Sequence, residues 1–423
     1  MITGLAFLIL LLLRVPIGFV LLGSSITFIL ASGNLRLLAA TPQILFNGLE
    51  VYGLLAIPLF ILLGEIMNEG GITGRLITAA RVWLRRVPNE LSYVSLFSNL
   101  MLASILGSAT AQIAVMSRVM VPSMERAGYD RSYAAAITAA GGLLGPIIPP
   151  SMAFIMYGVV SQVSIGRLFI GGIIPGLLLF AFMCIYIALR PAKLRDATEQ
   201  IEIDGADSSK WRATRNALLS LSIPAIIVGG IALGIVTPTE SAALAIFAAI
   251  LLGGLCFREL KWQSIPGILE RTTVNSALVF FLIVSANIFG FVLIYNQIPN
   301  QVAALVQGFT QNPTMFLVLV FLLLVLVGIV LDAFAALIIL VPILLPMAQN
   351  SYGIDPIHFG VVVCLTLMLG LLTPPVGAGL YVAAATSRVE IMSLSRALFP
   401  FFLIAALVIL VVIFFPATVQ ILL

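Results

Sequence analysis

The chain reads Gly141-Gly142-Leu143-Leu144-Gly145-Pro146-Ile147-Ile148-Pro149-Pro150 in the middle of a long apolar region. These glycines and prolines predict a break in the helix, because proline lacks a backbone donor and glycine has weak helix propensity. In lipid, backbone polar groups must be satisfied internally, so a break at that depth must be packed in protein or line a wet cavity. Taken alone, the stretch is also compatible with a simple proline kink.

The same pattern returns 225 positions later as Gly370-Leu371-Leu372-Thr373-Pro374-Pro375-Val376. At this single offset the matched pairs are Pro149-Pro150 with Pro374-Pro375, Gly145 with Gly370, Gly128 with Gly353 and Asp130 with Asp355. Four coincidences at one offset indicate an internal repeat. Two discontinuous segments, one in each half of a chain, are typical of the binding site of a secondary transporter.

The composition is that of a membrane protein. Of the 423 residues, 61% are hydrophobic and only 9% are charged, and the mean hydropathy is +1.19, whereas soluble domains carry about 25% charged residues. At about 20 residues per span there is room for roughly a dozen membrane segments. The arginines are scattered through short loops, so the formal net charge of +4 does not indicate a nucleic-acid partner.

Residues 89–121 form an apolar region that is interrupted near its middle by Gly107-Ser108-Ala109-Thr110. Each arm spans only about 20 Å as a helix, which is too short to cross a hydrocarbon core of about 30 Å. The region is therefore a re-entrant hairpin or one long kinked helix. Both of its ends are basic, with Arg81, Arg85 and Arg86 before it and Arg118, Arg126 and Arg131 at the other end. The positive-inside rule places both ends in the cytoplasm, which favours the hairpin.

The second half contains a similar apolar region without lysine or arginine at its flanks, so we expect it to open to the outside. The sequence thus predicts an all-α polytopic membrane protein made of two repeats with inverted topology. The first predicted repeat covers 1–190 and contains an inner hairpin at about 89–121 and a broken helix at about 132–160. A cytoplasmic linker follows at 191–215. The second predicted repeat covers 216–423 and contains an outer hairpin at about 313–350 and a broken helix at about 356–387.

A few polar side chains lie at membrane depth. A carboxylate there costs about 2.5–3.5 kcal/mol, so Asp332 either contacts an ion, a proton or the substrate, or caps the helix that follows it. Ser104, Ser108 and Thr110 surround the inner hairpin tip, and Thr373 lies inside the second broken motif. Such hydroxyls can bond to their own helix, but they are also good sodium ligands, because hard cations take oxygen.

Two classes of protein are excluded by what the sequence lacks. None of the three lysines, Lys193, Lys210 and Lys261, follows a glycine, so there is no Gly-x-x-x-x-Gly-Lys-Ser/Thr loop for a nucleotide. There is also no His-Glu-x-x-His motif and no paired His/Cys cluster for a catalytic metal. We therefore expect neither an ATP-driven pump of that kind nor an enzyme.

The chain contains six motifs that occur together in one known family. They are Gly107-Ser108-Ala109-Thr110-Ala111, Arg126-Ala127-Gly128-Tyr129-Asp130, Ile148-Pro149-Pro150-Ser151, Leu331-Asp332-Ala333, Pro342-Ile343-Leu344-Leu345-Pro346 and Leu372-Thr373-Pro374-Pro375-Val376-Gly377. From about Arg14 to the end, the chain resembles the large membrane subunit of tripartite ATP-independent periplasmic (TRAP) transporters, the DctM family.

The resemblance implies a multi-pass protein of the bacterial inner membrane that imports a small organic anion, such as a C4-dicarboxylate or a sugar acid, by symport with sodium. It implies two partners, a small four-helix membrane subunit of the DctQ type and a periplasmic binding protein that delivers the substrate. It also implies an elevator mechanism, in which the hairpins and broken helices move against a fixed scaffold.

The resemblance further implies where the ligands bind, with at least two sodium ions. One sodium ion would lie among Ser104, Gly145, Ile148 and Ser151, and the other among Gly328, Gly370, Thr373 and Val376. The substrate carboxylate would lie near Ser108, Thr110 and Asp332. Two alternatives stay open at this point, namely a stand-alone sodium- or proton-coupled carrier without a binding protein, and a channel.

Overall fold

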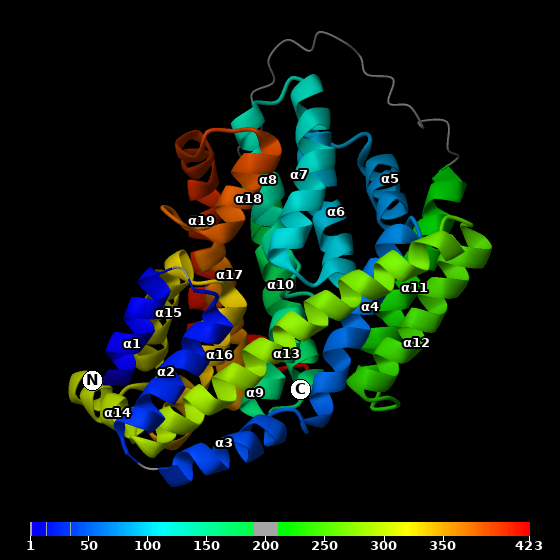
Figure 1. Ribbon diagram of the computed structural model, residues 1–423. Helices are drawn as coiled ribbons and strands as arrows, with labels where there is room; N and C mark the ends of the chain where they lie inside the picture. Colours follow the sequence, from blue (N-terminus) through cyan, green and yellow to red (C-terminus); the bar gives the residue numbers. More distant parts are fainter. Residues whose placement is uncertain (1, 14, 34, 190–209) are drawn as a thin grey trace.

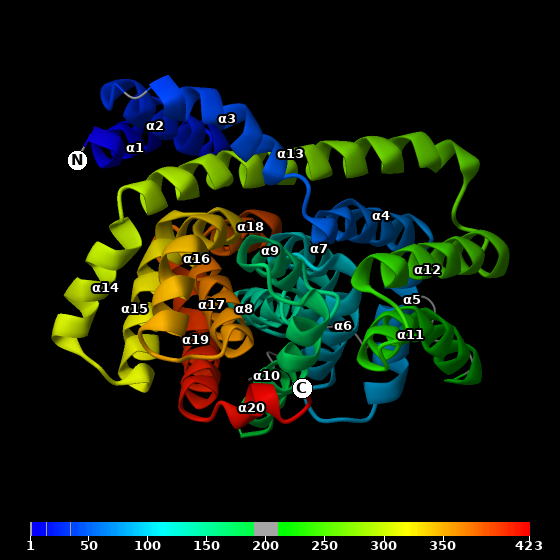
Figure 2. The same cartoon turned by 90° about the horizontal axis from the view of Figure 1, so that it is seen from below.

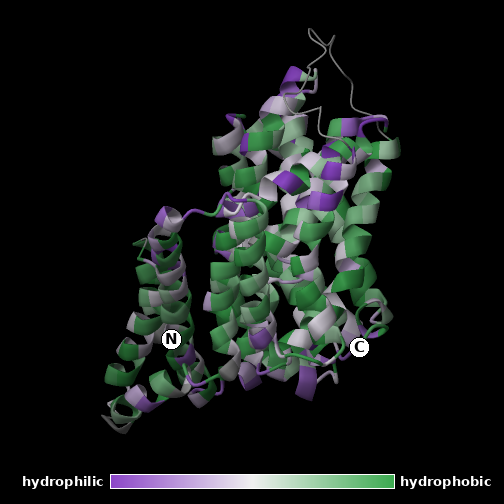
Figure 3. Ribbon diagram, turned by 90° about the vertical axis from the view of Figure 1, so that its right-hand side faces the viewer, coloured by the Kyte–Doolittle hydropathy of each residue, from purple (hydrophilic) through white to green (hydrophobic). Residues whose placement is uncertain are grey.

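The computed structural model describes residues 2–13, 15–33, 35–189 and 210–423, and every regular element among them is helical (Figure 1). Seven of the described helices are long and apolar enough to cross a membrane, and α4 with α5, bent by 63°, form one further candidate span. Apolar residues cover the faces of the helices, and hydrophilic residues gather mostly near their ends (Figure 3). The fold is that of an all-α polytopic membrane protein, as the sequence predicts.

One group of helices comes from the start of each half of the chain. Its members are α1 (Ile2–Leu12), α2 (Ile17–Ala31), α3 (Leu35–Asn47), α4 (Ala56–Glu69), α5 (Ile72–Leu84), α11 (Lys210–Ala232), α12 (Pro238–Ile250), α13 (Ile265–Tyr295) and α14 (Ile298–Phe309), with short turns η1 (Tyr52–Leu55) and η4 (Trp262–Ser264) and a π-helical end to α12 at η3 (Leu251–Cys256). Helix α13 runs along one side of the molecule, with α1–α3 outside it (Figure 2). We call this group the outer frame.

The outer frame is held together partly by charge. The Arg271 guanidinium of α13 donates to two carboxylates of α4, to Glu65 at 2.7 Å and to Glu69 at 2.8 Å. A third ion pair joins Arg75 of α5 to Glu259, just after α12, at 2.7 Å. All three pairs connect a helix of the first half to a segment of the second half. They are partly exposed, so they fix the orientation of the helices more than they add stability.

The remaining helices form the inner group, which holds the predicted hairpins and broken helices. Its members are α6 (Glu90–Leu106), α7 (Ala109–Arg126), α8 (Arg131–Gly141), η2 (Gly142–Leu144), α9 (Met152–Ser161) and α10 (Ile165–Leu189) from the first half, and α15 (Pro313–Val330), α16 (Ala333–Asn350), α17 (Pro356–Leu371), α18 (Ala378–Ser387), α19 (Ile391–Phe414) and α20 (Ala417–Gln420) from the second.

Helices α8 and α17, which correspond to each other in the two halves, begin with the same kind of cap. Asp130 caps α8 by accepting from the Tyr133 amide at 3.0 Å, and Asp355 caps α17 by accepting from the Ile357 amide at 2.9 Å. The preceding Gly128 and Gly353 both have positive φ, a conformation that other residues rarely adopt. The peptide bonds before Pro150 and Pro375 are both cis. The aspartate cap, the glycine with positive φ and the cis proline each recur at the 225-residue offset. The inverted repeat as a whole stays a prediction.

The inner group is assembled by crossed packing between the two halves. Helix α18 of the second half packs against α7 of the first half, and α9 of the first half packs against α16 of the second. Figure 1 shows α6, α7, α8 and α18 in the upper part of the molecule and α9, α15 and α16 in the lower part. The second part of each broken helix, α9 or α18, thus packs against the hairpin of the other half.

Some segments differ from the sequence-based expectation. Residues 191–209 of the predicted linker lie outside the described residues, and 210–215 are not a loop, because α11 already begins at Lys210. The segment with Arg81 before the first hairpin is helical, α5, because its apolar side chains, among them Ile72, Leu76 and Ile77, recur on one buried face.

Candidate functional site

The tip of the first hairpin lies against the first broken motif. The turn between α6 and α7 is made at Gly107, which has a φ of 58°. An ideal Cβ on Gly107 would lie 3.1 Å from the Met152 Cγ and 3.3 Å from the Pro150 carbonyl oxygen. The hairpin tip and the gap between η2 and α9 therefore form one compact region inside the protein.

The residues predicted to hold the first sodium ion lie in this region. Gly145 and Ser151 are in the broken motif itself, and both are buried. The Ser151 hydroxyl caps α9 by accepting from the Phe154 amide at 3.1 Å, and it also donates to the Pro146 carbonyl. The Ser104 hydroxyl donates to the Met101 carbonyl at 2.7 Å. Both serines thus bond to their own segment of backbone, which for Ser104 is the alternative role that the sequence allowed.

Two buried carboxamides next to this motif were missed by the sequence analysis. Asn99 of α6 and Gln112 of α7 are fully buried, and the Gln112 Nε2 donates to the backbone oxygen of Asn99 at 2.7 Å and to its Oδ1 at 2.9 Å. The Asn99 Nδ2 donates to the Ser95 carbonyl at 2.9 Å. A signal was present, because each residue is the sole carboxamide within its apolar helix, α6 or α7.

The second broken motif is built on a close helix crossing. Gly328 of α15 and Gly370 of α17 touch backbone to backbone, so the structure brings together two residues predicted to hold the second sodium ion. Thr373 is buried, and its hydroxyl donates to the Leu369 carbonyl at 2.9 Å. Val376 is exposed.

The predicted substrate contacts are only partly brought together. The Ser108 and Thr110 hydroxyls lie 3.2 Å apart at the start of α7 and are half-buried. Asp332 is exposed, and it caps α16 by accepting from the Phe334 amide at 3.0 Å. Within the described ranges, no hydrogen bond joins Asp332 to Ser108 or Thr110. The structure therefore shows the capping role of Asp332 and leaves a role in binding as a prediction.

The two broken motifs differ in exposure. Residues 145–151 are buried apart from the half-buried Ile148, whereas Pro374, Pro375 and Val376 are exposed. Two segments with closely related sequences thus occupy different environments in this one conformation.

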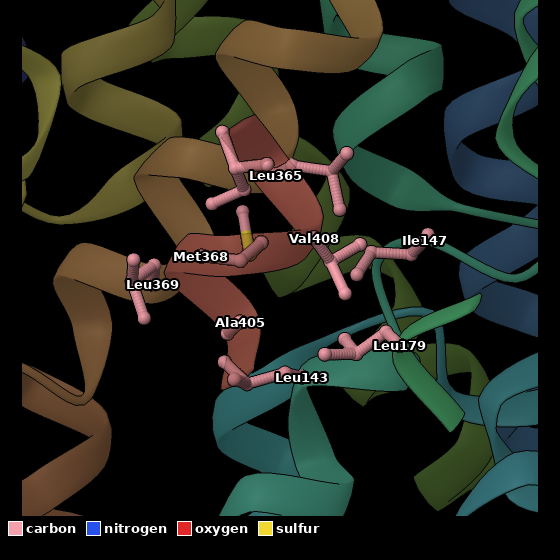
Figure 4. A pocket seen from close by; sticks show the side chains of 9 residues that line it. Leu143, Ile147, Leu179, Leu365, Met368, Leu369, Ala405 and Val408 are labelled. Atoms are coloured by element: carbon pink, nitrogen blue, oxygen red, sulfur yellow. The ribbon is translucent and has the colours of Figure 1, made fainter. Parts of the chain in front are cut away.

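An apolar pocket lies between η2, α10, α17 and α19 (Figure 4). Its lining residues are Leu143, Ile147, Leu179, Leu365, Met368, Leu369, Ala405, Val408 and Ile409. All of these side chains are apolar, so the pocket offers a carboxylate no side-chain donor. Among the residues that the structure describes, no three His, Cys, Asp or Glu side chains gather as a metal site.

The fold defines the class of protein. Helical hairpins that face discontinuous membrane helices are typical of a secondary transporter. The fold also matches the crystal structure of the Alcanivorax borkumensis YdaH transporter, with a TM-score of 0.69 at 16% identity over 92% of this chain and 90% of that one.

The sequence places the chain in a particular family. The family described as "Tripartite ATP-independent periplasmic transporter, DctM component" matches residues 5–418, and the chain belongs to this family. It is 35% identical to the sialic acid TRAP transporter large permease protein of Vibrio cholerae, over 93% of this chain and 92% of that protein. It is 34% identical to the C4-dicarboxylate TRAP transporter large permease protein of Pseudomonas aeruginosa, over 91% of each. It is therefore a transporter component of the bacterial inner membrane and not an enzyme.

Proposed function

We propose that this chain imports a small organic anion by symport with sodium, and that it receives the anion from a periplasmic binding protein. The observation that carries the proposal is the paired arrangement of hairpin and broken helix, with Gly107 against Pro150 in the first half and Gly328 against Gly370 in the second. Interrupted helices leave backbone oxygens that can hold a cation and N–H groups that can hold an anion.

Sodium is the coupling ion that suits these surroundings. The buried polar side chains beside the two motifs are neutral: the hydroxyls of Ser104, Ser151 and Thr373 and the carboxamides of Asn99 and Gln112. A hard monovalent cation accepts such ligands, whereas Mg²⁺ and Ca²⁺ sites usually contain carboxylates. We therefore assign one sodium ion to each motif.

The start of α7 suits a carboxylate. Ser108 is the N-cap residue of α7, and its side chain accepts no hydrogen bond from the backbone N–H groups of the helix. The first N–H groups of a helix carry partial positive charge and bind anions. The Ser108 and Thr110 hydroxyls lie 3.2 Å apart, and the one that accepts from the other keeps its own O–H to donate. Relatives are named for sialic acid and for C4-dicarboxylates, and both compounds are carboxylates, so a carboxylate is the substrate class that we assign.

The division into outer frame and inner group supports an elevator mechanism. In the proposed movement, α6–α10 and α15–α20 travel together, because each broken helix packs on the hairpin of the other half. The outer frame, linked across the halves by the ion pairs of Arg271 and Arg75, stays in place. The small membrane subunit implied by the family would extend this frame.

Reconstitution tests the proposal. The chain would be placed in liposomes with its small membrane subunit, and uptake of labelled carboxylates measured with and without the binding protein, in an inward sodium or potassium gradient. We expect saturable uptake that needs both sodium and the binding protein. Equal uptake without the binding protein would favour a stand-alone carrier, and uptake that does not saturate would favour a channel. Uptake that is the same in the potassium gradient would refute sodium coupling.

A further inference from the structure

One oxygen atom in the buried amide pair of Asn99 and Gln112 lacks a hydrogen-bond partner among the described residues. Gln112 is fully buried, and its Oε1 has no hydrogen-bond partner among the described residues. A buried acceptor without a partner is unfavourable in the interior of a protein. An unpartnered acceptor at a proposed transport site therefore indicates that another group binds there.

The orientation of the Gln112 amide is fixed by its neighbours. The group that faces the Asn99 backbone oxygen must be a donor, because a carbonyl oxygen can only accept. The same group also donates to the Asn99 Oδ1 at 2.9 Å, while the Asn99 Nδ2 is used by the Ser95 carbonyl at 2.9 Å. A flipped Gln112 amide would place two oxygens against each other. The free atom is thus the oxygen and not the nitrogen.

This oxygen points to the first broken motif. An ideal Cβ on Gly145 would lie 2.5 Å from the Gln112 Oε1 and 3.3 Å from the Gly142 carbonyl oxygen. Two oxygens therefore lie on the same side of Gly145, one from the hairpin and one from the backbone of η2. Any residue with a side chain at Gly145 would fill the space between them.

We propose that Gln112 supplies an oxygen ligand to the monovalent cation bound at the first broken motif. Its hydrogen-bond partner Asn99 is neutral, and so are Ser95 and Thr138, the polar residues beside Asn99. Neutral oxygen ligands suit sodium better than a divalent cation, which prefers carboxylates. Because Gln112 lies on α7 and Gly145 on the broken helix, a shared cation would also hold the hairpin tip against the break.

The inference rests on the proposed sodium coupling, so its test measures sodium binding directly. The full chain, purified with its small membrane subunit, would be melted at rising NaCl concentrations, with choline chloride keeping the ionic strength constant. Bound sodium raises the melting temperature by mass action, and the titration gives an apparent sodium affinity. LiCl and KCl titrations report the selectivity for the monovalent cation.

Two variants separate a ligand from a structural link. Gln112→Met removes the oxygen and the donor, and we expect the apparent sodium affinity to fall about tenfold or more. Gln112→Glu loses the donor to Asn99 but keeps an oxygen, and we expect its sodium affinity to be retained or increased. Ser117→Ala is the matched control, because it removes another buried, unpartnered oxygen from α7.

The outcomes that overturn the inference are distinct. An affinity within about twofold of wild type in Gln112→Met would remove Gln112 from the site. An equal loss in Gln112→Met and Gln112→Glu would show that the link to Asn99 matters and not the oxygen. If Gln112→Met does not fold, Gln112→Asn, which withdraws the oxygen by one methylene group, replaces it in the same comparison. If wild-type uptake needs no sodium, the proposed function itself fails, whereas a sodium-dependent wild type with an unaffected variant defeats only this inference.

Discussion

Gly328 and Gly370 meet backbone to backbone where α15 crosses α17. An ideal Cβ on Gly370 would lie 2.7 Å from the Gly328 Cα, and one on Gly328 would lie 3.0 Å from the Gly370 Cα. Contacts that short require one of the helices to move, because the neighbouring atoms belong to the backbone. The close crossing that positions the second broken motif therefore depends on glycine at both positions.

Gly370→Ala tests this contact. We expect it to destabilise the protein by about 1–3 kcal/mol, the usual cost of overpacking, and to reduce uptake, because α17 leads directly into the broken motif. Thermal melting and uptake in liposomes measure the two effects. Gly308→Ala in α14 is the control, since nothing lies within 4 Å of its ideal Cβ. A Gly370→Ala protein as stable and active as Gly308→Ala would contradict the prediction.

Asp332→Asn separates capping from a role of the charge. Asparagine caps a helix about as well as aspartate, so we expect the melting temperature to be nearly unchanged. If the charge takes part in binding, uptake should fall about tenfold or more, since hydrogen bonds to charged groups contribute about 1.5–3 kcal/mol. Asp355→Asn is the matched control, because Asp355 also caps a helix, by accepting from the Ile357 and His358 amides. Normal uptake by Asp332→Asn would leave this residue with capping alone.

Thr373→Val tests the second sodium site. The change keeps the shape of the side chain and removes one oxygen, so we expect uptake to require more sodium than in the wild type. Thr366→Val in α17, the helix that precedes Thr373, is the control: the Thr366 hydroxyl is buried and donates to the Val362 carbonyl at 2.7 Å, as the Thr373 hydroxyl donates to Leu369 at 2.9 Å. Sodium dependence that is identical in both variants would place the second cation elsewhere.

The orientation of the two hairpins can be measured by labelling. After replacement of Cys184, Cys256 and Cys364, single cysteines at positions 85 and 126 should react with an impermeant maleimide from the cytoplasmic side. A cysteine at position 311 should react from the periplasmic side, as the lack of basic residues around the second hairpin predicts. Positions 85 and 126 are exposed at the two ends of the first hairpin, so labelling from opposite sides would remove the inner hairpin.

The sequence predicts the main elements of the site because their causes are local. Glycine and proline break helices wherever they occur, and the capping residues Asp130 and Asp355 precede their helices directly. The family and the positions of the motifs could therefore be inferred from the sequence. The sequence predicts a linker up to residue 215, whereas α11 begins at Lys210, because the helix continues into a stretch of charged residues that periodicity does not mark as membrane-embedded.

The contacts between distant segments could not be predicted in the same way. Asn99 and Gln112 lie on different hairpin arms, and only the packed structure brings their amides together. The contact of Gly328 with Gly370 likewise depends on the crossing of two helices. The unequal exposure of the two broken motifs is a property of one conformation, and related sequences give no indication of it. Sequence patterns therefore predict where helices begin, break and end, but not which side chains from distant segments come into contact.

The crossed packing of α9 on α16 and of α18 on α7 has a consequence for biogenesis. When the ribosome has completed the first half, α7 still lacks the helix that will cover it, and α9 lacks its hairpin. The first half must therefore wait in the bilayer, without its final neighbours, until α18 has been synthesised. Two halves produced as separate polypeptides should be degraded when made singly and should accumulate only when made together.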